Sequence, residues 1–394
     1  GINGSGKHNN WSLQTNTGIN LFAPGKNPKA NMLFITFIVN AMMMVYKNQD
    51  LLRASIVSAT NLHRLGANEA PPSIMSVFLG KYLTKMLDEL VEYVGDKKMT
   101  QEEKTALKLG IGRIPEILID NTDRNRTSPF AFTGNRFEFR AAGSSSNCAA
   151  PMIVINSAMA HQLNIFRDEV DEQVKNGLGV EESVFRVLKK MIEESKSICF
   201  EGDGYSENWK EEATKRGLTN INSVPEAILK YETEYSKEVL IGEGILNERE
   251  LKSRIEVEME KYVKKIQIES RVLGDLTINH IVPTALIYQN RLLKNLLGMK
   301  QIFPEEEFDQ LSLARKNLVK EISEHVTSIK AMVKDMTLER KYANRIEDIR
   351  EKAFEYEKKV FPYLEAIREH VDALEMEIDN EIWPLPKYRE LLFL

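Results

Sequence analysis

The most apolar run of the chain, NMLFITFIVNAMMMVY, spans Asn31–Tyr46 and limits the possible folds more than any other feature. The run predicts a helix with apolar side chains on all sides, and such a helix must be surrounded by the rest of the protein. A membrane span is the alternative. However, Asn40 interrupts the run, which is also shorter than the roughly 20 residues that cross a bilayer. The sequence therefore favours a buried, central helix.

Residues 1–150 and 151–394 differ in charge and in predicted secondary structure. Residues 1–150 contain 17 Lys or Arg and 12 Asp or Glu, with Gly- and Pro-rich loops, whereas residues 151–394 contain 36 and 46 and follow a mostly helical pattern. The net charge of −5 and the pI of about 5.9 provide no basic field for nucleic acid. With only two cysteines, Cys148 and Cys199, the chain is not a disulfide scaffold, and it fits a reducing cytoplasm.

The first residues, GINGSGKHNNWS, almost match the phosphate-binding P-loop pattern, but His8 stands where that pattern needs Ser or Thr. A P-loop also opens a helix, and the residues after His8 are poor helix formers. His8 could instead bind a divalent metal, while Gly4 and Gly6 let the backbone approach a ligand. The alternative is a Gly-rich turn in which His8 has no function, and these residues alone do not exclude it.

The hexapeptide NRFEFR alternates strictly between charged and aromatic residues, which predicts a strand. Arg136, Glu138 and Arg140 share one face, and Phe137 and Phe139 share the other. An exposed strand with a local ion pair is one interpretation. Because the aromatic face suits a core sheet, the charged face also fits a ligand cavity, where arginine binds phosphate or carboxylate and glutamate binds Mg²⁺ or Mn²⁺.

Two predicted loops carry further candidates. RLGANEAPP contains Arg64, which could bind a carboxylate, and Glu69, which could act in a mobile lid or accept a proton. The second loop contains RNR, Arg124–Arg126, about ten residues before the predicted strand. One histidine, one strand glutamate and several arginines together indicate an ATP-using site with a carboxylate substrate.

These motifs resemble those of glutamine synthetases, and they follow the order of that family. NGSGKHNNWS is similar to N-G-S-G-M-H-x-H-x-S, RLGANEAPP to R-L-V-P-G-Y-E-A-P, and RNRT with NRFEFR to R-N-R-S with R-I-E-x-R. SVPEAILKYETEYSKEVLIGE resembles the late L-P-x-S-L-x-E-A-L segment. The variant residues within these motifs, the long helical extension and the C-terminal segment WPLPKYRELL resemble the type III branch of the family.

The resemblance implies a fold and a division of the chain. The fold would be α+β, with residues 1–255 as the C-terminal part of a catalytic domain, built on a curved antiparallel sheet with helices. Residues 256–394 would form a mostly α-helical C-terminal domain. Because the chain starts at Gly1 inside a motif, we expect an upstream half to be missing, and we expect this piece alone to be inactive.

The resemblance also implies a role for each site residue. The implied metal ligands are His8 and Glu138; the glutamate-binding residues are Asn3, Gly4, Arg64 and Arg140; the ATP- and phosphate-binding residues are Ser12, Arg126 and Arg136; and the catalytic residues are Glu69, Arg126 and Arg140. Arg140 would contact the transferring phosphoryl group as well as the substrate. Glu69 would lie on a flap and take a proton from ammonium.

The implied activity is the ATP-dependent ligation of ammonia to glutamate through γ-glutamyl phosphate, with Mg²⁺ or Mn²⁺. The implied assembly is a homo-oligomeric double ring, a dodecamer, with active sites between subunits. It would be cytoplasmic and would bind neither nucleic acid nor membrane. Some positions depart from the family: Asn10 replaces a second His, SPFAF follows RNRT, and GAN stands before Glu69, so the nucleotide contacts are the least defined.

Three other interpretations remain. The protein could be a catalytically inactive relative with a regulatory or structural role, although its complete set of candidate residues favours an enzyme. It could be a ligase that joins another amine to glutamate. Residues 256–394 could also form an independent helical interaction module.

Overall fold

The computed structural model describes residues 6–25, 27–66, 72–94, 127–144 and 146–392. The chain divides into two compact units, Gly1–Ile255 and Glu256–Leu394. The assignment of these units to a catalytic portion and a C-terminal domain stays a prediction.

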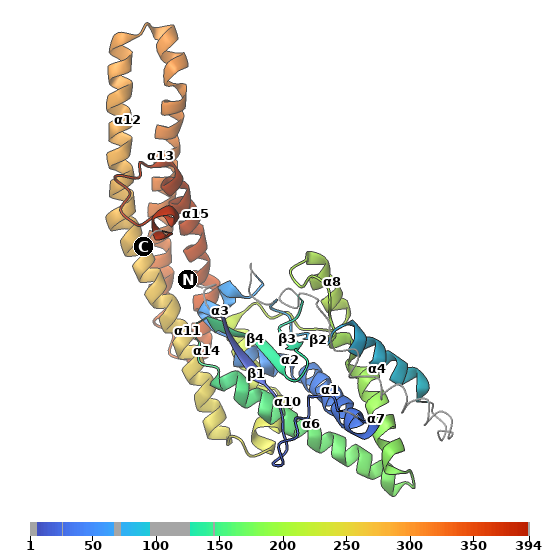
Figure 1. Cartoon of the computed structure of the whole chain (residues 1–394). Helices are drawn as coiled ribbons and strands as arrows, with labels where there is room; N and C mark the ends of the chain where they lie inside the picture. The colour runs from blue at the N-terminus through green and yellow to red at the C-terminus, as the bar shows by residue number, and fades with distance from the viewer. Residues whose placement is uncertain (1–5, 26, 67–71, 95–126, 145, 393–394) are drawn as a thin grey trace. The chain divides into compact units, whose positions relative to one another are not determined.

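The first unit contains a four-stranded sheet in the order β1-β4-β3-β2 (Figure 1). β1 (Gly6–Trp11) and β3 (Phe130–Phe132) both run antiparallel to β4 (Phe137–Ser144), whereas β2 (Val77–Phe78) runs parallel to β3. The sheet is therefore mixed, and the prediction of an antiparallel sheet is wrong for its β2–β3 pair. Parallel neighbours need a long connection, which the segment between β2 and β3 provides.

The aromatic face of β4 forms the centre of the core beside the sheet. Phe137 and Phe139 are both fully buried, which confirms the strand predicted from NRFEFR. The ring of Phe137 lies 4.9–6.2 Å, between centroids, from the rings of Phe130, Phe22, Phe132 and Trp11. Alternation along β4 thus buries one face in a cluster of aromatic rings.

Helix α1 (Pro28–Lys47) contains the apolar run and packs against α6 (Ala149–Lys175) and α7 (Val180–Ser195). Its interior Asn40 is fully buried and satisfied, because its Nδ2 donates to the Thr36 carbonyl (2.8 Å) and its Oδ1 accepts from Gln162 Nε2 (3.1 Å). The prediction of a buried central helix is confirmed.

Within the described part of the chain, α1 is the one helix long and apolar enough to cross a membrane, over Ala30–Lys47. Inside the structure, 67% of this stretch is buried. Neighbouring helices therefore cover most of the apolar surface that a bilayer would otherwise have to cover.

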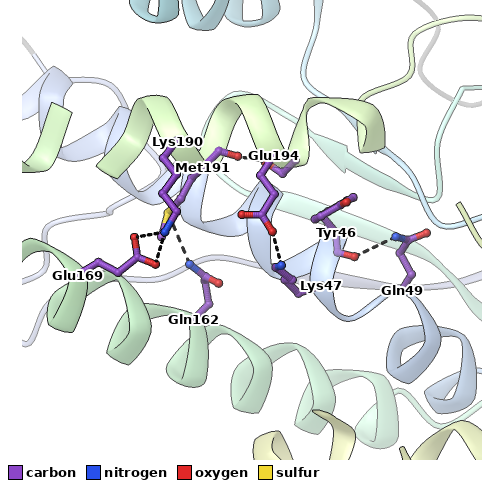
Figure 2. Close-up of polar contacts among 9 residues, drawn as sticks. Tyr46, Lys47, Gln49, Gln162, Glu169, Lys190, Met191 and Glu194 are labelled. Carbon is purple, nitrogen blue, oxygen red and sulfur yellow. Dashed lines mark hydrogen bonds and ion pairs between the residues drawn. The ribbon is translucent and has the colours of Figure 1, made fainter. Parts of the chain in front are cut away.

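Polar contacts join the edges of α1, α6 and α7 (Figure 2). Lys190 Nζ binds both carboxylate oxygens of Glu169, at 2.9 and 3.0 Å, and Lys47 pairs with Glu194. Ion pairs with exposed partners stabilise a protein by only about 0–1 kcal/mol. Burial of the apolar faces therefore contributes more to the packing of these helices than the ion pairs do.

The other elements among the described residues of the first unit are shorter. They are α2 (Gln49–Ser55), α3 (Ala59–Arg64), α4 (Lys81–Tyr93), α8 (Glu207–Lys215), α9 (Val224–Leu229), α10 (Glu234–Lys237), two 3₁₀ turns (Lys196–Ile198 and Lys230–Glu232) and a π-helical turn (Glu238–Gly242).

The second unit is helical throughout its described residues. Its long helices α12 and α13 form a hairpin, and α15 packs against α13 (Figure 1). Its elements are α11 (Glu248–Leu276, which begins in the first unit), α12 (Val282–Ile302), α13 (Glu305–Ala343), α14 (Ile349–Glu355), α15 (Phe361–Glu377), α16 (Tyr388–Leu391) and two π-helical turns (Thr277–Ile281 and Tyr356–Val360).

Candidate functional site

The described part of the opening motif is a strand. Gly6–Trp11 forms β1, and the next helix, α1, begins only at Pro28. A P-loop requires a helix that starts at its Lys, so that its N-terminus faces the phosphates. The P-loop interpretation of this motif is therefore wrong.

The side chains of His8 and Glu138 meet across two neighbouring strands. The β1–β4 pairing is regular from Asn9 to Trp11 and shifts between Lys7 and Asn9, so His8 lies at an irregularity of the ladder. His8 Nδ1 lies 2.9 Å from Glu138 Oε1, and the side chains are 34% and 18% exposed. Two residues far apart in sequence thus place a nitrogen and an oxygen donor at one point.

These two side chains fit part of a metal site. Imidazole nitrogen and carboxylate oxygen both bind divalent ions, and the carboxylate suits Mg²⁺ or Mn²⁺. The described residues contain no group of three or more His, Cys, Asp or Glu able to hold a metal. His8 and Glu138 would therefore supply two ligands, and other groups would have to complete the coordination. Their role as metal ligands stays a prediction.

Arg64 lies directly beside the His8 end of β1. A Cβ atom added to Gly6 would come within 2.7 Å of Arg64 Nη2 and 3.1 Å of His8 Nε2, so these groups fill the space that the missing side chain leaves. Arg64 is 4% exposed, and its Nη1 has no hydrogen-bond partner among the described residues. A buried donor without a partner is costly, and it fits a position that binds an anion.

Burial lowers the pKa of the Arg64 guanidinium from its ordinary value, and the electrostatic contribution of Tyr205 opposes this shift. Desolvation disfavours the charged form of any base, which explains the direction. Burial removes the hydration of the guanidinium charge. A ligand carboxylate bound to this guanidinium would replace that hydration with an ion pair.

The short helix α3 positions Arg64, and sequence analysis assigned Arg64 to a loop. Ser58 caps the helix by accepting from the Asn61 backbone N–H (3.1 Å), and Arg64 is the last helical residue. The Asn61 side chain donates to the carbonyls of Ile56 (2.8 Å) and Ala141 (2.9 Å), which joins α3 to β4. Nothing in the sequence indicated the contact of Asn61 with β4.

Arg140 lies two residues after Glu138 on the same face of β4 and is more deeply buried than Glu138. It is 3% exposed, its backbone N–H donates to the Pro129 carbonyl (2.9 Å), and its Nη2 donates to the Ser128 carbonyl (2.8 Å). The guanidinium is thus tied to the backbone at the start of β3. Its implied contact with a phosphoryl group stays a prediction.

Ser12 and Arg136 lie at the opposite end of the β1–β4 pair from Gly6. Trp11 pairs with Phe137 in the last step of the ladder, Ser12 comes just after Trp11, and Arg136 comes just before Phe137. Both residues are exposed. The other implied site residues, Asn3, Gly4, Glu69 and Arg126, lie outside the described residues.

The structure therefore brings His8 and Glu138 together and places Arg64 beside His8 at Gly6. A buried guanidinium beside a nitrogen–oxygen donor pair fits an anionic ligand together with a divalent ion. The lack of a side chain at Gly6 leaves room for the Arg64 guanidinium.

Comparison with known proteins points to one family. A family model described as the glutamine synthetase C-terminal domain matches residues 183–300. The chain is 69% identical over 393 residues to a glutamine synthetase of Bacteroides fragilis, covering 100% of this chain and 54% of that protein.

Two more distant relatives agree. The chain is 36% identical over 405 residues to a type-3 glutamine synthetase of Dictyostelium discoideum, covering 100% of this chain and 53% of that protein. It is 35% identical over 406 residues to a glutamine synthetase of Butyrivibrio fibrisolvens, again with 100% of this chain and 55% of the relative. The chain thus spans about half the length of the curated relatives it matches.

Proposed function

Because the chain belongs to the glutamine synthetase family, we propose that the full-length protein joins ammonia to glutamate at the expense of ATP. The observation that carries this proposal is the buried Arg64 guanidinium beside the His8–Glu138 pair. It offers a carboxylate-binding group next to two divalent-metal donors, which is what a reaction between glutamate and ATP requires.

The proposed reaction has two steps. An oxygen of the glutamate side-chain carboxylate attacks the γ-phosphorus of ATP, and the bond from that phosphorus to the ADP oxygen breaks. Ammonia, after ammonium has lost a proton, then attacks the carbonyl carbon of γ-glutamyl phosphate, inorganic phosphate leaves, and the new amide nitrogen releases one further proton. Phosphorylation is needed because a carboxylate oxygen is a poor leaving group until it carries a phosphoryl group.

The residues of this chain would have separate roles in the reaction, according to where they lie in the site. Arg64 would hold the α-carboxylate of glutamate, and Arg140 would stabilise charge on the transferring phosphoryl group. His8 and Glu138 would be ligands of a bound Mg²⁺ or Mn²⁺, and the ion would supply charge neutralisation at the phosphates. Glu69 would accept the proton of ammonium.

Asn3 and Gly4 would line the glutamate site, while Ser12, Arg126 and Arg136 would contact ATP. The family resemblance supports these roles. It also supports a cytoplasmic double ring, a dodecamer, whose active sites lie between subunits.

The test is ATP-dependent glutamine formation by the full-length protein with glutamate and ammonium. We expect activity in the unmodified protein and in Lys85→Ala, whose side chain is exposed on α4. We expect Arg140→Ala to lose at least about a hundredfold in kcat, as removal of one charged stabilising group does in comparable sites. Arg140→Lys, which retains a charge, serves as the second variant where Arg140→Ala weakens folding.

Loss of activity in Arg140→Ala with intact oligomers would support the ligase. A well-folded, unmodified oligomer that forms no glutamine would contradict it. The same protein would then be tested with other amines, since a ligase for another amine and an inactive regulatory relative give different results in that assay.

A separate prediction concerns the metal. We expect His8→Ala to weaken Mn²⁺ binding by the full-length protein about tenfold or more, because the variant removes one donor of a coordination sphere. Isothermal titration with MnCl₂ measures this affinity, with His280→Ala, an exposed histidine of the second unit, as the control. An unchanged titration in His8→Ala would remove His8 from the ligand set.

A further inference from the structure

Two histidines of the second unit face each other across a helix–helix seam. His325 on α13 and His370 on α15 place their Nδ1 atoms 2.8 Å apart. Their ring centroids are 5.0 Å apart, and the ring planes cross at 67°. Both side chains are half-buried, so water reaches them.

A direct contact between two Nδ1 atoms constrains their protons. A neutral imidazole carries one proton, so one ring must donate from Nδ1 while the other presents its Nδ1 lone pair. The two Nδ1 atoms therefore point at each other in a hydrogen bond between the helices. After a rotation of both side chains and loss of the shared proton, the two Nδ1 lone pairs could bind one metal ion.

We propose that His325 and His370 form a binding site for a borderline divalent transition ion, with Ni²⁺ or Cu²⁺ fitting best. Metal–imidazole bonds are roughly 2.0–2.1 Å long, so two ligands at a right angle have nitrogens about 3.0 Å apart, and two tetrahedral ligands about 3.4 Å. In the structure the Nδ1 atoms meet head-on at 2.8 Å, so both side chains must rotate before an ion can lie within bonding distance of each. Square-planar and tetragonal coordination, with right angles between neighbouring ligands, is typical of Cu²⁺ and Ni²⁺.

The surroundings suit a cation with water as its remaining ligands. The described residues include no third His, Cys, Asp or Glu close enough to complete a metal-binding group, so solvent must complete the sphere. One turn before His325 lies Glu321, which is hydrogen-bonded to Glu377 of α15 and raises the pKa of that carboxyl, although burial is the larger cause of the shift. This carboxyl pair lies on the same two helices. A hydrogen bond between two carboxyl groups shares one proton, so the pair carries one negative charge in that state, which attracts a cation.

This site is distinct from the His8–Glu138 pair in its chemistry. Imidazole pairs bind Cu²⁺, Ni²⁺ and Zn²⁺ well and bind Mg²⁺ poorly, because Mg²⁺ prefers oxygen ligands. Bound across α13 and α15, an ion would join the two helices and stabilise their packing in proportion to its occupancy. The proposal therefore does not depend on the proposed ligase activity.

The experiment uses the full-length protein, stripped with a chelator and saturated with Mg²⁺ to occupy oxygen-rich sites. Isothermal titration with NiCl₂ and thermal unfolding with and without NiCl₂ are measured for the unmodified protein, His325→Ala and His370→Ala. The matched control is His280→Ala, which removes an exposed histidine of the same unit outside the pair.

We expect one Ni²⁺ per chain to bind here, and we expect either pair variant to weaken this binding at least tenfold and to remove the rise in Tm. The control should behave as the unmodified protein does. Equal Ni²⁺ affinity in the unmodified protein and both pair variants, or displacement of Ni²⁺ by Mg²⁺, would overturn the proposal.

A spectroscopic measurement keeps the proposal testable where an alanine variant fails to fold. The first equivalent of Cu²⁺ added to the unmodified, Mg²⁺-saturated protein should give an electron paramagnetic resonance spectrum with hyperfine coupling to two imidazole nitrogens. His370→Gln, which retains size and polarity, should reduce this to one nitrogen. A spectrum with oxygen ligands alone would contradict the site.

Discussion

Replacing Arg64 with alanine is expected to reduce kcat/KM for glutamate by about a hundredfold or more in the full-length protein. Hydrogen bonds to a charged partner contribute about 1.5–3 kcal/mol each, and a guanidinium can make two of them to one carboxylate. Every 1.4 kcal/mol is a factor of ten, so two lost bonds reach this range. The glutamate carboxylate that Arg64 would bind is not the reacting one, so the loss should be mainly in KM.

The reason to expect so large an effect is the burial of this side chain. Arg64 is 4% exposed, and its Nη1 has no partner among the described residues, so no neighbouring protein group there competes with a ligand for that atom. The kcat/KM of Arg64→Lys for glutamate should lie between those of the unmodified protein and Arg64→Ala. An ammonium retains the charge but cannot form the two parallel hydrogen bonds that a guanidinium makes to one carboxylate.

A matched control separates binding from folding. Arg53 of the same unit is also buried and also has an Nη1 without a partner among the described residues, but its Nε donates to the Ile221 carbonyl (3.2 Å), and we use it as a structural arginine. Arg53→Lys should lower Tm without changing KM for glutamate. Steady-state kinetics across glutamate concentrations decide the matter: an unchanged KM in Arg64→Ala would remove Arg64 from the glutamate site.

The periodic elements of this fold were predictable from the sequence because their patterns are local. The uniformly apolar run predicted the buried helix α1, and the period of two in NRFEFR predicted the half-buried strand β4. Contacts between distant segments were not predictable. The parallel β2–β3 pair, the irregular step between Lys7 and Asn9, and the attachment of α3 to β4 through Asn61 all depend on the tertiary fold.

In the candidate site, too, local sequence patterns were predictable and contacts between distant segments were not. Single motifs indicated residue types that bind metal or carboxylate, but each also had a structural interpretation, and only their order along the chain indicated a family. Neither order nor spacing predicts that His8 and Glu138 come within 2.9 Å or that Gly6 leaves space for Arg64. Those facts follow from how β1 pairs with β4 and how α3 lies on them.

The largest stability effect is expected for Phe137→Ala. The ring of Phe137 is fully buried, is stacked on Phe130 at 4.9 Å and meets Phe22 edge-on at 5.1 Å. Truncation removes buried apolar surface and leaves a cavity that surrounding rings fill only in part. For a buried phenylalanine the free energy of unfolding falls by about 3–5 kcal/mol.

This loss should also reach the candidate site, because Phe137 is the residue next to Glu138 on β4 and pairs with Trp11 of β1. A loosened aromatic cluster would let the two strands move relative to each other and would lengthen the His8–Glu138 contact. Phe137→Leu, which refills most of the cavity, should recover much of the stability.

Denaturant unfolding of the full-length protein measures the effect, with Phe354→Ala as the matched control. Phe354 lies on α14 and is 38% exposed, so its removal should change the free energy of unfolding by about 0.5 kcal/mol or less. Equal effects of the two substitutions would mean that the aromatic face of β4 contributes no more to stability than an exposed ring. The explanation of why NRFEFR forms the strand beneath the site would then fail.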